Sequence, residues 1–186
     1  MAGKIYRIAS LSLLLFCLIS VVLALQRPAL PQVEVSAEAA RSFDEKIAEL
    51  NQPRQKRAPG EIHLTESELN SKLQESLQAP VSVSSPIAVR GATVHLKGNE
   101  LVGIFTVNIS GKDVYVTIGG TLGGSTGLLQ FTPLEVKMGS LPIPVSAVKY
   151  KLREKLDSPE MRDRMKLPEM VKDIRVENGE MVIQIR

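Results

Sequence analysis

The feature that most constrains how this chain folds is an uncharged run near its N-terminus, from Ile8 to Leu25. As a helix these 18 residues would span about 27 Å, which is just enough to cross the hydrocarbon core of a bilayer. Lys4 and Arg7 precede the run, and positive charge on that side predicts a cytoplasmic N-terminus. We therefore expect residues 1–25 to be a transmembrane anchor or signal sequence that exports the rest of the chain.

Two readings of this segment stay open. Val22-Leu23-Ala24 resembles a signal peptidase site, whereas the length of the run and the missing polar region after it favour an uncleaved anchor. Cys17, the only cysteine, lies inside the run and is interpreted as a lipid-facing thiol. The exported part therefore has no disulfide or cysteine-bound zinc and must fold on its own core.

Charge and aromatic content exclude one class of partner. Without Lys4 and Arg7 the chain carries 21 Lys and Arg against 20 Asp and Glu. It has no Trp and only four Phe, too few for the stacking surfaces that nucleic-acid-binding domains use. We do not expect this protein to bind nucleic acid.

The remainder divides into two parts. Residues 26–60 read as a stem, a short helix with Phe43, Ile47 and Leu50 on one face, and a basic Pro-rich linker. The linker residues are also able to reach anionic lipid headgroups. Residues 61–186 read as an extracytoplasmic α+β domain.

This domain begins with a helix signal and continues with strands. Thr65 and Glu68 fit a capping box, and leucines at a spacing of four follow it. Alternating apolar residues then predict an antiparallel meander with a turn at 98–100. The apolar phase changes at Pro133, which indicates either a bulge there or a strand that crosses the twist of the sheet. A second helix follows with an apolar face of Val145, Val148, Leu152 and Leu156. A hairpin turning at Asn178-Gly179 closes the chain. We predict a curled antiparallel β-meander packed on an N-terminal helix and a second helix, with a closing hairpin, all preceded by a single transmembrane helix.

The stretch KMGSLPIP, residues 137–144, allows two interpretations. In the first, Leu141 and Ile143 are core residues that fasten a turn to the sheet, and Pro144 starts the helix. In the second, the same residues form an apolar lip beside basic side chains that hold phosphate headgroups.

The sequence carries few residues in patterns that indicate catalysis. His63 and His95 belong to no metal-ligand spacing, and His95 is interpreted as a solvated strand residue. No nucleophile motif and no carboxylate pair suited to a cleft stands out. We predict a protein that is not an enzyme, with no cofactor, no catalytic residue and no metal site.

Three stretches resemble the YpmS-like family of membrane-anchored bacterial proteins: LTESELNSKL at 64–73, KMGSLPIPVSAVKYKL at 137–152 and LPEMVKDIRVENGEMVIQI at 167–185. The layout is also similar, more distantly, to TULIP-type lipid-binding domains, in which a curled sheet wraps a helix around acyl chains. The resemblance implies a domain at the outer face of a bacterial cytoplasmic membrane, held by a single-pass anchor.

We expect a non-catalytic domain that binds a lipid or similar amphiphile in an apolar groove. The residues predicted to form the groove come from the sheet and the first helix: Phe105, Val107, Val116, Ile118, Phe131, Leu69 and Leu73. In this hypothesis that helix, which also carries Leu77, plugs or gates the groove. The residues predicted at the groove mouth are Leu141, Ile143, Lys149, Lys151 and Arg153. The alternative is an anchored scaffold that binds an envelope protein and no small ligand.

Overall fold

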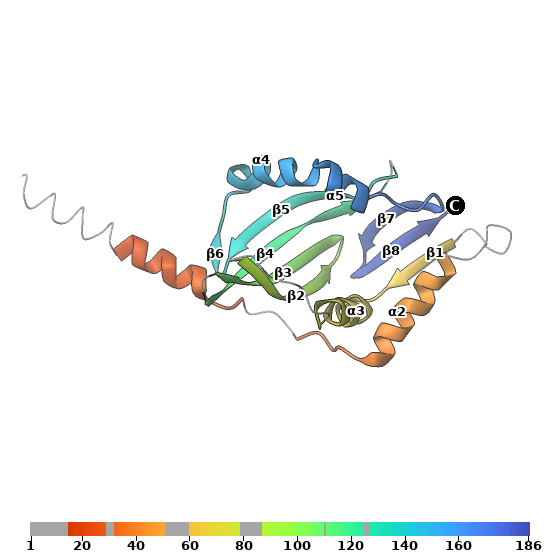
Figure 1. Cartoon of the computed structure of the whole chain (residues 1–186), viewed down its shortest axis with the longest axis horizontal. Coiled ribbons are helices and arrows are strands. Elements are labelled where there is room, and N and C mark those ends of the chain that lie inside the picture. Colours follow the sequence, from red (N-terminus) through yellow and green to blue (C-terminus); the bar gives the residue numbers. More distant parts are fainter. Residues whose placement is uncertain (1–14, 29–31, 51–59, 79–86, 110, 125–126) are drawn as a thin grey trace, which may run out of the picture.

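The computed structural model describes residues 15–28, 32–50, 60–78, 87–109, 111–124 and 127–186. It is an α+β fold with two antiparallel sheets that lie side by side (Figure 1). The first elements are α2 (Ala37–Leu50), β1 (Gly60–Leu64), α3 (Glu66–Gln78), β2 (Ile87–Lys97), β3 (Glu100–Ile109) and β4 (Lys112–Gly123). The others are β5 (Gln130–Met138), β6 (Leu141–Pro142), α4 (Val145–Leu156), α5 (Pro159–Arg164), β7 (Val171–Glu177) and β8 (Glu180–Ile185). Most of the predicted basic linker, residues 51–59, lies outside the described residues.

The small sheet has the strand order β1-β8-β7. Asn178 and Gly179, with φ of 53° and 83°, turn β7 into β8. Positive φ at both residues is typical of a type I′ turn, so the predicted closing hairpin is confirmed. Residues 60–64 add a third strand, with Ile62 opposite Ile183, and the sequence did not reveal this pairing.

The main core lies between the small sheet and helices α2 and α3. Its buried residues are Leu50, Ile62, Leu64, Val171, Ile183 and Ile185. Phe43 and Ile47 of α2 pack against them, as does Leu69 of α3. The helix predicted as part of the stem is therefore part of the folded unit.

The large sheet has the order β2-β3-β4-β5-β6, which confirms the predicted meander. In its β4–β5 pair, Gly119 lies opposite Glu135 and Gly120 opposite Pro133. Leu134 is the extra residue between them, and its side chain is 52% exposed. The bulge predicted at Pro133 is therefore present, and it turns Leu134 away from the sheet interior.

Helix α3 covers the free edge of β2. The side-chain amide of Asn70 accepts from the N–H of Val94 at 2.7 Å and donates to the C=O of Val94 at 2.6 Å. Glu66 accepts from the N–H of Leu96 at 2.8 Å. These polar side chains satisfy backbone groups that an edge strand would otherwise expose.

The N-terminal part that the structure describes begins with a helix over residues 15–25. No helix in the described part of the chain is long and apolar enough to cross a membrane.

Candidate functional site

One face of the large sheet is apolar, and the strand register puts most of the predicted groove residues on it. Phe105 lies opposite Val116, and Val107 lies opposite Val114. On β4, Ile118 shares this face with Val116 because alternate residues of a strand point the same way. Phe131 joins it through its pairing with Leu122. We call these residues, with Leu122, Val136 and Met138, the apolar face.

The apolar face is only partly covered. Val114 and Val136 are buried, whereas Phe105, Val116 and Phe131 are half-buried. The aromatic rings of Phe105 and Phe131 pack against glycines. A Cβ at Gly103 would lie 3.1 Å from the ring of Phe105, and one at Gly120 would lie 2.8 Å from the ring of Phe131. The glycines thus let the aromatic rings lie close to the sheet backbone.

Helix α4 lies along β5 (Figure 1) and carries one narrow apolar stripe. The stripe consists of Val145, Val148, Leu152 and Leu156, all half-buried, and no residue of α4 or α5 is buried. Pro144 precedes its first turn, where a missing N–H leaves no hydrogen bond unmade. A helix whose apolar stripe is only half-buried is loosely seated on its sheet.

A cavity of about 660 Å³ lies between this helical pair and the start of β5. We call it the α4 groove. Its apolar wall is made by Leu128, Leu129, Phe131, Pro133, Leu152, Leu156 and Met165. Its charged lining residues are Lys149, Arg153, Arg162 and Asp157. The volume lies within the range of ligand pockets in proteins, and an apolar wall with a net positive rim suits an anionic amphiphile.

The KMGSLPIP stretch forms the edge of the apolar face. Gly139 has φ of 59° and turns β5 into β6. Leu141 lies opposite Met138, and the N–H of Ile143 donates to the C=O of Val136 at 2.8 Å. Both side chains are half-buried. They extend the sheet as edge residues and do not line the α4 groove.

The structure places the other predicted residues as follows. Phe131, Lys149 and Arg153 come together in the α4 groove. Lys151 is exposed and lies outside its lining.

Leu69 packs into the core of the small sheet, and neither Leu69 nor Leu73 lines the groove. Because α3 packs against α2 and β2, it is α4 and not α3 that closes over the groove. The α4 groove is thus bordered by a different helix from the one predicted to plug or gate a groove.

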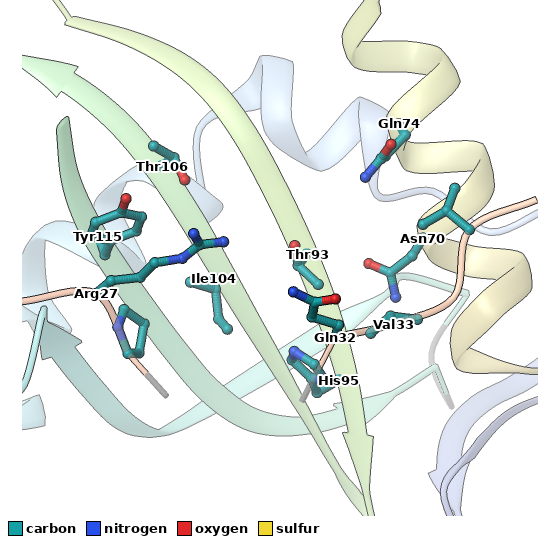
Figure 2. A pocket seen from close by; sticks show the side chains of 12 residues that line it. Arg27, Gln32, Val33, Asn70, Gln74, Thr93, His95, Ile104, Thr106 and Tyr115 are labelled. Atoms are coloured by element: carbon teal, nitrogen blue, oxygen red, sulfur yellow. The ribbon is translucent and has the colours of Figure 1, made fainter. Parts of the chain in front are cut away.

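The opposite face of the large sheet borders a second, more polar cavity of about 280 Å³ (Figure 2). It is lined by side chains of α3, of strands β2 to β4, and of the stem residues that cross this face: Arg27, Pro28, Gln32, Val33, Val35, Asn70, Gln74, Thr93, His95, Ile104, Thr106 and Tyr115. The guanidinium of Arg27 lies 6.0 Å from the ring centre of Tyr115, within cation–π range.

His95 corrects an expectation. It is only 2% exposed, and its Nδ1 lies 2.9 Å from a carboxylate oxygen of Glu66. The interpretation of His95 as a solvated strand residue is therefore wrong. His95 does share a face of β2 with Thr93, but α3 covers this side of the strand.

Glu68 is the most strongly perturbed acid of the described residues. Burial raises the pKa of its carboxyl, but hydrogen bonds from Lys46, Ser42 and the Thr65 N–H, together with the charge of Lys46, outweigh burial and lower the pKa to about 2. The Lys46 Nζ lies 2.7 Å from the carboxylate, and the Thr65 N–H donates at 2.8 Å. This capping box therefore joins α3 to α2 and serves the fold.

The described residues contain no group of three or more His, Cys, Asp and Glu side chains that could hold a metal ion. Comparisons of this chain with protein-family models, with curated proteins and with solved structures find no match. The resemblance to the YpmS-like family and to TULIP-type domains accordingly stays a prediction.

Proposed function

We propose that this protein is a membrane-tethered, non-catalytic domain that binds an anionic amphiphile, such as a phospholipid, in the α4 groove. The observation that carries the proposal is the pairing of an apolar wall with a cationic rim in one cavity. Phe131, Leu152 and Leu156 contact the acyl part in this proposal. Lys149, Arg153 and Arg162 hold the phosphate.

The way α4 is seated supports access to this site. No residue of α4 is buried, yet both ends of the helical pair are tied to the sheet. The N–H of Ile143 bonds to Val136 before α4, and the N–H of Leu129 donates to the C=O of Met165 at 2.8 Å after α5. The helix can therefore rise from β5 without unfolding the sheet, as a lid does.

The apolar N-terminal helix supports the tether. Its exposed large side chains are Leu15, Phe16, Leu18, Ile19, Val21, Val22 and Leu25. A helix that is apolar on all sides is stable only when lipid or protein surrounds it. In the proposal it enters the bacterial cytoplasmic membrane, with the N-terminus in the cytoplasm and the folded domain outside.

Native mass spectrometry of the full chain, extracted from membranes in mild detergent, tests the ligand. We expect a stoichiometric anionic lipid on the wild-type chain and its loss from Leu152→Glu. The matched control is Tyr150→Glu on the same helix, because Tyr150 is 77% exposed and lies outside the groove lining. Circular dichroism verifies that both variants are folded.

A second matched pair tests the headgroup contacts. Lys149→Glu with Arg153→Glu reverses two charges that line the groove, whereas Lys151→Glu with Lys155→Glu reverses two exposed charges of the same helix. We expect anionic lipid to be lost at least ten-fold more readily from the first pair. A folded wild-type chain without lipid, or equal losses from both pairs, contradicts the proposal and favours the anchored scaffold.

A further inference from the structure

The end of the large sheet where β3 turns into β4 is joined to the apolar N-terminal helix. The N–H of Ser140 donates to the C=O of Leu23 at 2.8 Å, and the N–H of Gly139 donates to the C=O of Tyr115 at 2.7 Å. A side chain at Gly139 would collide with the carbonyl groups of Leu23 and Ala24. The β5–β6 turn is thus fitted closely against the end of the helix.

The chain after this helix is also fastened to the domain. Arg27 lies over Tyr115 near the same end of the sheet. Farther along, Ser67 Oγ donates to the C=O of Glu34 at 2.7 Å, and the N–H of Ser36 donates to Ser71 Oγ at 3.1 Å. Contacts at both ends of the segment from Leu23 to Ser36 fix the direction in which the helix leaves the domain.

The same end of the sheet exposes apolar and basic side chains together. Ile109, at the end of β3, is 43% exposed, and Val89 of the neighbouring β2 is 53% exposed. Lys112 lies opposite Ile109 in the register, and Arg90 sits in the bulge next to Val89. Both cations are exposed. Exposed apolar side chains beside cations suit the interface of an anionic bilayer.

We infer that this end of the large sheet rests on the bilayer surface. Val89 and Ile109 enter the interfacial layer, and Arg90 and Lys112 lie beside lipid phosphates. The inference rests on the proposed membrane tether but not on a lipid in the α4 groove. The strands then stand away from the membrane, with the β2–β3 turn at Asn99 farthest along the same two strands.

Two labelled positions at opposite ends of β3 test this orientation. At about 3.3 Å per residue, Ile109 and Asn99 are separated by about 30 Å along the strand. Both are exposed, so a label disturbs neither core. The full chain carries Cys17→Ser with Ile109→Cys or Asn99→Cys, each labelled with acrylodan and reconstituted in vesicles containing phosphatidylglycerol and lipids brominated near the headgroup.

We expect the label at Ile109→Cys to emit at shorter wavelength and to be quenched several-fold more than the label at Asn99→Cys. Adding Arg90→Glu and Lys112→Glu reduces that quenching. Equal, water-like emission from both positions overturns the orientation, and a lipid still detected by mass spectrometry then leaves the groove proposal standing. A chain that separates from the vesicles on flotation overturns the tether and the orientation together.

Discussion

The two sheets of this protein bury similar apolar residues in different ways. On the small sheet, Leu64 of β1 is 1% exposed, and Val182 of β8 is 2% exposed. On the large sheet, Phe105, Val116 and Phe131 are only half-buried, and α4, which packs against β5, has no buried residue. Apolar composition alone therefore does not make a core. The number of elements that pack against a sheet face decides whether its apolar side chains are buried in a core or line an open groove.

The largest effect is expected in the closely packed core beside the small sheet. Leu64→Ala removes a nearly inaccessible side chain from the core shared by the small sheet, α2 and α3. We expect a loss of about 2–5 kcal/mol in the free energy of unfolding, because the cavity it leaves adds to the lost burial. Urea unfolding followed by circular dichroism measures it. A loss below about 1 kcal/mol would mean that this core is as loose as the groove.

The next effect is a pH dependence that arises where α2 and α3 meet beside the small sheet. The pKa of Glu68 lies at about 2, below its ordinary value of 4.5, so its ionised form stabilises the fold above pH 4.5. This contribution, at most about 3 kcal/mol, is lost as the pH falls from 4.5 to 2.

Glu68→Gln keeps the shape and removes the titration. We expect the difference in unfolding free energy between wild type and Glu68→Gln to be largest at pH 6–7 and to shrink toward pH 2. Unfolding curves at several pH values measure this difference. A difference that does not change with pH would show that Lys46 and Thr65 do not hold the carboxylate in solution.

The smallest effect is expected at α4, which packs loosely on the large sheet. Leu152→Ala removes the same number of atoms as Leu64→Ala, but from a half-buried position that borders the α4 groove. We expect a loss below about 1 kcal/mol, because the cavity is already present. The same urea titration applies. A loss equal to that of Leu64→Ala would make α4 a core helix and would count against its role as a lid.

Sequence patterns predicted local features well. The turn at 98–100, the bulge at Pro133 and the hairpin turn at Asn178-Gly179 are all present. The capping box of Thr65 and Glu68 forms as expected, with the N–H of Glu68 donating to Thr65 Oγ1 at 3.3 Å. Each depends on residues close in the chain, which restrict the backbone directly.

Features that depend on distant partners were missed. Residues 60–64 form a strand only because β8 offers its edge, more than a hundred residues away. Asn70 pairs with the edge of β2 although its sequence neighbours suggest only a helix surface. His95 is buried because α3 lies over it. No periodicity in a strand or helix states which other element will cover it.

The sequence by itself determined the helices, most strands, their turns and the faces on which apolar residues gather. Only the tertiary structure decided that α3 seals an edge of the large sheet while α4 leaves a groove beside β5. The physical reason is that removing Val, Leu, Ile or Phe from water lowers the free energy wherever the side chain is buried. The same residues therefore line a filled core or an open groove, and the packing of distant elements selects between them.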